Sequence, residues 1–108
     1  LKTPSGKAVF KVEAVDSSQV ILSVGKRRWQ IRVPADCWNG IPGFLANKGW
    51  VLIGARHDQP SPEGSVDEYV KRFTHGVSAA SYVVPILERI YLVQVDRREP
   101  NKIRLIDC

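Results

Sequence analysis

The sequence predicts an α+β fold: an antiparallel β-sheet of about five strands packed by three or four helices, with a helix pair and a hairpin at the C-terminal end. Residues 8–33 alternate apolar and polar side chains between short turn signals, which is typical of antiparallel strands. Residues 65–90 carry apolar side chains at helical spacing, and residues 92–106 alternate again around a polar loop. A chain of 108 residues can bury one core, so we expect residues 1–108 to form one domain.

The first part of the chain is expected to be a three-stranded meander. Residues 8–15, 19–24 and 26–33 are the strands, and Asp16-Ser17-Ser18 and Gly25-Lys26 are the turns between them. Connections this short favour antiparallel neighbours with one buried face and one wet face.

The middle of the chain is expected to be less regular. Residues 35–40 are predicted to be a loop. A short helix follows, with Pro42 in its first turn and Gly49 at its end. Residues 50–55 then form an apolar run, which indicates a buried strand, and the Pro/Gly-rich residues 58–64 indicate a loop.

Two helices and a hairpin are predicted for the remainder. Ser65 and Glu68 have the spacing of a capping box, and His75-Gly76 should end the helix that they start. Ser78 is expected to cap the next helix, which should run to about Ile90 and be kinked by Pro85. The side of this helix away from its apolar stripe carries Ser78, Ser81, Tyr82, Pro85 and Arg89. Residues 92–96 and 102–106 should be the strands of the hairpin.

The composition excludes several classes of protein. No apolar run is long enough to cross a membrane, so we expect no membrane partner. Two cysteines, Cys37 and Cys108, cannot make a four-ligand zinc site, and we expect no cofactor and a reducing, cytoplasmic setting. The isolated pair His57-Asp58 lacks a neighbouring nucleophile, so we do not expect an enzyme. The absence of methionine, together with the Ile, Val and Arg usage, favours a thermophilic source.

Positive charge is concentrated at the two ends of the chain. The whole chain has 16 Lys and Arg against 11 Asp and Glu, a net charge of +5. Residues 1–35 carry a net charge of +5, residues 36–88 carry −2, and residues 89–108 carry +2. This asymmetry favours a polyanionic partner on one surface, although a basic surface without a partner is the alternative.

The strand at residues 26–33 is the centre of the functional prediction. Successive side chains of a strand point to opposite faces, so Lys26, Arg28, Gln30 and Arg32 should form one cationic face. Trp29 shares the other face with Ile31 and Val33, so burial in the core is an alternative to a binding role. Cations that follow phosphates, combined with aromatic faces that stack on bases, are the features of single-strand binders. The candidate nucleic-acid-binding residues are Lys11, Lys26, Arg28, Trp29, Arg32, Trp38, Tyr82, Tyr91, Arg97 and Arg98.

Two resemblances bear on this prediction. Residues 65–106 resemble the second half of a winged helix-turn-helix, which implies duplex DNA as ligand and the second helix as the reading element. Such domains often have a glycine after that helix, where this chain has Tyr91. The whole order is similar to the ThermoDBP-type single-stranded DNA-binding proteins of hyperthermophilic archaea, on residues 26–33, 38–50 and 65–90. That resemblance implies a cleft of basic and aromatic residues, and a homo-oligomer formed through a segment outside these residues.

The sequence therefore predicts a domain that binds single-stranded DNA largely without sequence preference, with RNA as an open alternative ligand. A winged-helix module for duplex DNA and a protein-interaction domain are the alternative functions.

Overall fold

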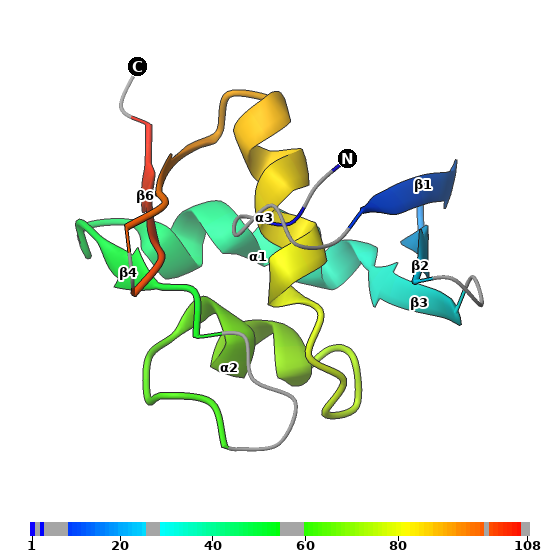
Figure 1. The fold of residues 1–108 in the computed structure, drawn as a ribbon, viewed down its shortest axis with the longest axis horizontal. Coiled ribbons are helices and arrows are strands. Elements are labelled where there is room, and N and C mark those ends of the chain that lie inside the picture. Colours follow the sequence, from blue (N-terminus) through cyan, green and yellow to red (C-terminus); the bar gives the residue numbers. More distant parts are fainter. Residues whose placement is uncertain (2, 4–8, 26–28, 55–59, 99, 107–108) are drawn as a thin grey trace.

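The computed structural model describes residues 1, 3, 9–25, 29–54, 60–98 and 100–106. The elements follow in the order β1 (Phe10–Val15), β2 (Gln19–Val24), β3 (Trp29–Pro34), α1 (Ala35–Leu45), β4 (Val51–Leu52), α2 (Val66–Lys71), α3 (Ala80–Arg89), β5 (Val93–Asp96) and β6 (Lys102–Leu105). This order confirms the α+β class. The predicted single sheet of about five strands is wrong, because the described strands form two antiparallel sheets, β1-β2-β3 and β4-β6-β5. The two sheets lie on opposite sides of the helices (Figure 1).

The first sheet is the meander that the alternation predicts. Asp16 shapes the turn between β1 and β2, since its Oδ1 accepts hydrogen bonds from the backbone N–H and the hydroxyl of Ser18 and from the backbone N–H of Gln19. A bulge interrupts the pairing of β1 with β2 between Val12 and Ala14. The pairing of β2 with β3 is regular from Gln19 opposite Pro34 to Val24 opposite Trp29.

Helix α1 separates the two sheets, and here the sequence prediction was wrong. The predicted loop at residues 35–40 is the first half of α1, which begins directly after Pro34. Pro34 has extended backbone angles that suit the residue before a helix. Pro42 lies inside the helix rather than in its first turn. The chain leaves the first sheet as it turns into α1 immediately after β3, and β4 pairs with β6 in the second sheet.

One core cluster unites the elements. It contains residues of both sheets and of all three described helices, among them Leu22, Val33, Ile41, Val70, Leu87 and Ile103. Tyr69 lies in this cluster, stacked on Phe44 at 4.5 Å between ring centroids, and its hydroxyl donates to the carbonyl oxygen of Cys37 at 2.8 Å. Burial raises the pKa of the Cys37 thiol to about 11, which makes this thiol a poor nucleophile.

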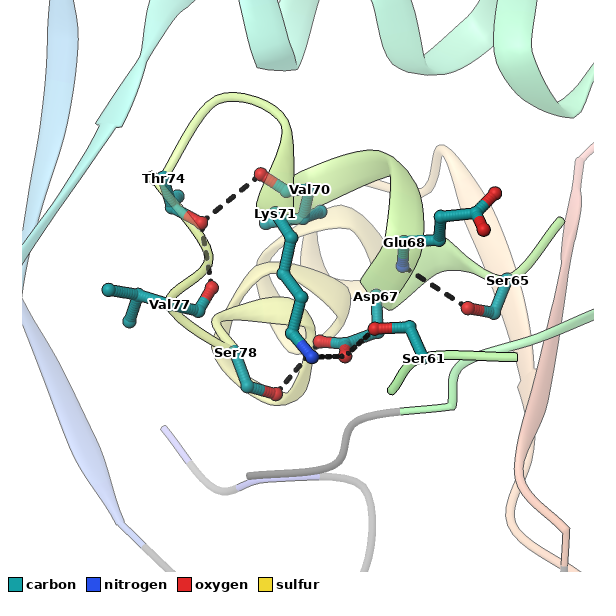
Figure 2. A network of polar contacts seen from close by, with 9 residues as sticks. All are labelled: Ser61, Ser65, Asp67, Glu68, Val70, Lys71, Thr74, Val77 and Ser78. Atoms are coloured by element: carbon teal, nitrogen blue, oxygen red, sulfur yellow. Dashed lines mark hydrogen bonds and ion pairs between the residues drawn. The ribbon is translucent and has the colours of Figure 1, made fainter. Parts of the chain in front are cut away.

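A polar network fixes α2 against α3 (Figure 2). Ser65 caps α2 as predicted, because its Oγ accepts the backbone N–H of Glu68. Asp67 is fully buried, and its carboxylate contacts Ser61 Oγ at 2.6 Å, Ser78 Oγ at 2.8 Å and Lys71 Nζ at 3.0 Å. Ser78 was expected to cap α3. That prediction is wrong, since Ala79 holds the cap position and the Ser78 hydroxyl donates to Asp67 instead.

None of the helices in the described part of the chain is both long enough and apolar enough to cross a membrane.

Candidate nucleic-acid interface

Two of the predicted cations lie on the same side of the first sheet, where Lys11, Gln30 and Arg32 are exposed, Ile21 is half-buried and Ser23 is buried. The register places Lys11, Ser23 and Gln30 in one row across β1, β2 and β3, and Ile21 and Arg32 in a second row. We call these five residues the outer face. Lys11 and Arg32 are exposed, and neither forms an ion pair with an acidic residue that the structure describes. Lys26 and Arg28, which were predicted to extend this face, lie outside the described residues.

Trp29 is exposed at a corner of the first sheet. It lies opposite Val24, which pairs in turn with Phe10, so its side chain lies on the side of the sheet opposite to Arg32, as the alternation predicts. Burial in the core was the alternative, but the side chain is 66% exposed. Since β3 is an edge strand and Trp29 is its first residue, the ring lies at a corner of the sheet. An exposed indole ring can stack on a base.

Two other predicted aromatic residues have structural roles. Trp38 was placed in a loop, but it lies in α1 and is half-buried, and its Nε1 donates to the carbonyl oxygen of Val33 at 3.3 Å. Tyr82 is half-buried in α3, where its ring and the Phe10 ring pack edge to face at 5.2 Å between centroids. Both rings are packed against the core, and both are less exposed than that of Trp29.

The two predicted arginines of the C-terminal hairpin are neutralised. The guanidinium of Arg97 donates to both carboxylate oxygens of Glu88, at 2.9 and 2.6 Å. Arg98 donates in the same way to Asp96, at 3.0 and 2.9 Å. These hydrogen bonds lower the pKa of Glu88 and bring the pKa of Asp96 to about 2. The hairpin also lies across the molecule from the first sheet, so it does not extend the outer face (Figure 1).

Helix α3 does not present the exposed face that the sequence suggested. Ser78 and Pro85 are buried, Ser81 and Tyr82 are half-buried, and only Arg89 of the predicted set is exposed. The physical reason is that Phe10 of the first sheet packs against Tyr82, on the side that would have to enter a DNA groove. The second helix of the arrangement predicted for residues 65–106 is therefore covered on that side.

The sequence prediction missed one group of exposed residues, which lies at the second sheet. Trp50 was expected in the core, but it is 44% exposed. The guanidinium carbon of Arg104 lies 4.9 Å from the centroid of the Trp50 ring, and Arg104 Nε donates to Gln94 Oε1 at 2.6 Å. Strand β4 begins only at Val51, so the first residue of the apolar run lies outside the sheet. The alternation of residues 102–105 was the available signal, because it places Arg104 on the side opposite to the buried Ile103.

Tyr91 is exposed beside this group and has unusual backbone geometry. Its side chain is 82% exposed and its φ is +61°, in the left-handed region that favours glycine. The backbone N–H of Leu92 donates to the carbonyl oxygen of Leu87, and that of Tyr91 donates to the carbonyl oxygen of Glu88. These two bonds form a Schellman motif, which requires a left-handed residue at this position.

Among the residues that the structure describes, no three His, Cys, Asp or Glu side chains are grouped so that they could hold a metal ion.

Comparison with protein-family models, with curated protein sequences and with solved structures finds no match for this chain.

Proposed function

We propose that this chain binds single-stranded nucleic acid, with single-stranded DNA as the first ligand to test, and that it does so without catalysis. The observation that carries the proposal is the outer face, where Lys11 and Arg32 are exposed without an acidic partner among the described residues. Two phosphates of a strand can be neutralised there, and the exposed ring of Trp29 lies at the edge of the same sheet.

Contacts of this kind favour recognition without sequence preference. Lys11 and Arg32 offer charge to a backbone, whereas Gln30 is the one amide in their rows that could bond to a base edge. The similarity of the sequence to ThermoDBP-type proteins points to the same ligand class. The cytoplasmic location and the homo-oligomer remain predictions.

Duplex DNA is the weaker candidate. A winged helix-turn-helix reads the major groove with its second helix, and the side of α3 that would do so is occupied by Phe10 and Tyr82. A single strand needs no groove-reading helix, because its bases can turn toward an aromatic ring on a sheet.

The test is fluorescence anisotropy with labelled oligo-dT and with duplex DNA, at low and raised salt. We expect a preference for oligo-dT. Replacing Lys11 and Arg32 together by alanine should weaken binding about tenfold or more and make the salt dependence shallower, by about 0.7 in slope for each lost phosphate contact. Trp29→Ala should cost about tenfold, which is typical of one stacked base.

The matched control replaces Arg72 and Arg98 by alanine. It removes the same two positive charges, but from residues that already form ion pairs with Glu68 and Asp96. We expect this pair to bind almost as the wild type does. The proposal would be refuted if the wild-type protein did not bind oligo-dT at low salt. Equal losses for the two pairs would show that net charge, rather than the outer face, drives binding.

A further inference from the structure

Four shallow hollows follow one another across the molecule. The first, of about 230 Å³, and the second, of about 360 Å³, share Phe10 and Lys11. The second reaches Ile90, and its chain neighbour Tyr91 lines the third, of about 490 Å³. The third and the fourth, of about 380 Å³, share Gln94 and Ile106. We call this series the track. Its lining residues come from the first sheet, then from the C-terminal end of α3, and then from the second sheet. Figure 1 shows that this end of α3 lies between the two sheets.

The charges along the track favour an anion. Lys11 lines the first two hollows, Arg89 lines the second, and Arg104 lines the fourth. All three are exposed, and none forms an ion pair with an acid in the part of the chain that the structure describes. Glu88 in the third hollow is neutralised by Arg97. Glu13 in the first hollow is the opposing charge, so the track carries a net positive charge.

The aromatic residues along the track favour bases. Tyr91 and Trp50 both line the third hollow, and both are exposed. Arg104 is held in place by Gln94 and by the Trp50 ring, so its guanidinium is oriented before a ligand arrives. Tyr91 occupies a backbone position that glycine would occupy without steric cost, and its side chain makes no ring contact with the described residues that could account for it.

We infer that one strand of nucleic acid follows the track, with its phosphates at Lys11, Arg89 and Arg104 and with a base stacked on Tyr91. This inference rests on the proposed function and gives the strand a path beyond the outer face. An apolar protein partner fits less well, since cations interrupt the apolar residues at three of the four hollows.

The central test compares Tyr91→Gly with Tyr91→Phe, using labelled dT16 and the same anisotropy assay. Glycine relieves the left-handed backbone, so Tyr91→Gly should melt no lower than the wild type and any loss of binding is not a folding defect. We expect Tyr91→Gly to weaken binding about tenfold and Tyr91→Phe, which keeps the ring, to bind as the wild type does. Replacing Arg89 and Arg104 together by alanine should weaken binding and reduce the salt slope.

A second measurement locates the base directly. Oligo-dT that carries 5-iodouracil should crosslink on irradiation to the peptide that contains Tyr91, and mass spectrometry of the digest identifies that peptide. Glu13→Gln, which removes the opposing charge, should strengthen binding by a few-fold.

The outcomes separate the two proposals. If the Lys11 and Arg32 pair weakens binding while Tyr91→Gly and the Arg89 and Arg104 pair do not, the track is refuted and the outer-face interface stands. If Tyr91→Gly weakens binding of dT16 while replacing Lys11 and Arg32 together does not, the strand does not reach the outer face. Both proposals then fail in their stated form. If the wild type does not bind dT16, the proposed function fails and the track fails with it.

Discussion

The buried carboxylate of Asp67 accepts a hydrogen bond from Ser78 Oγ at 2.8 Å, and this bond ties the first turn of α2 to the residues that lead into α3 (Figure 2). The same carboxylate contacts Ser61 and Lys71, so each of its oxygens has a partner. The backbone N–H of Asp67 donates to the carbonyl oxygen of Ile53, next to β4. One residue, through its side chain and its backbone, thus joins the second sheet region, α2 and α3.

Asp67→Asn should therefore destabilise the fold. The amide keeps the shape of the carboxylate, but it removes the charge beside Lys71 and presents N–H groups to donors that need an acceptor. We expect the free energy of unfolding to fall by about 2–4 kcal/mol in urea titrations. Arg72→Ala is the control, because it breaks an exposed pair with Glu68 at 3.7 Å and should cost less than about 1 kcal/mol. Similar losses for the two variants would contradict the role of Asp67.

Two glycines of α1 should respond in opposite ways to the same substitution. A Cβ at Gly40 would collide with the hydroxyl of Tyr69, whereas a Cβ at Gly43 meets nothing within 4 Å. We expect Gly40→Ala to destabilise by about 1–3 kcal/mol, because Tyr69 must move away from Cys37. Gly43→Ala should stabilise by about 0.5–1 kcal/mol through helix propensity.

The Gly40 prediction has an internal check. Tyr69→Phe removes the hydroxyl that the new Cβ would meet, so Gly40→Ala should cost less in the Tyr69→Phe background than alone. Additive losses in thermal unfolding would mean that the collision is not the cause.

The pair of Asp96 and Arg98 should be visible in acid. The hydrogen bonds from Arg98 lower the pKa of Asp96 from its ordinary value of 3.8 to about 2. Because the folded pKa is the lower one, the pair stabilises the fold fully above the unfolded pKa, and this contribution is lost as the pH falls through about 2. An NMR titration of the Asp96 carboxyl carbon should give a midpoint near pH 2 in the wild type and a higher midpoint in Arg98→Ala. A wild-type midpoint near 3.8 would show that the pair does not persist in solution.

Cys37 should be protected from thiol reagents until the chain unfolds. Burial raises the pKa of its thiol to about 11, and the reactive form is the thiolate. In a Cys108→Ser background, we expect no modification by a disulfide reagent at pH 8 in the native state and complete modification in denaturant. Rapid native modification would place Cys37 at the surface.

Local patterns predicted the local structure well. The alternation of residues 10–34 predicted β1, β2 and β3 and placed Trp29 and Arg32 on opposite sides, because a strand has a fixed period of two. The capping motif at Ser65 predicted the start of α2, since the motif acts within one turn. The hairpin of β5 and β6 also lies where the pattern placed it.

The start of α1 could not be predicted in the same way. Residues 35–40 lack a strong helical pattern, and α1 buries Cys37, Ile41 and Leu45 against elements that come from other parts of the chain. Tertiary packing of this kind outweighs weak local propensity. The same error affected the predicted site. Trp38 was expected in a loop, but it lies on α1, which holds its ring against the core.

By itself, the sequence determined which side chains share a strand face and where α2 begins, since these depend on neighbours within a few residues. The tertiary structure alone decided which of those side chains reach solvent. It covered Tyr82 with Phe10, paired Arg97 with Glu88, and left Trp29 and Tyr91 exposed. The physical reason is that exposure and charge pairing depend on contacts between segments far apart in the chain, and no local period encodes them.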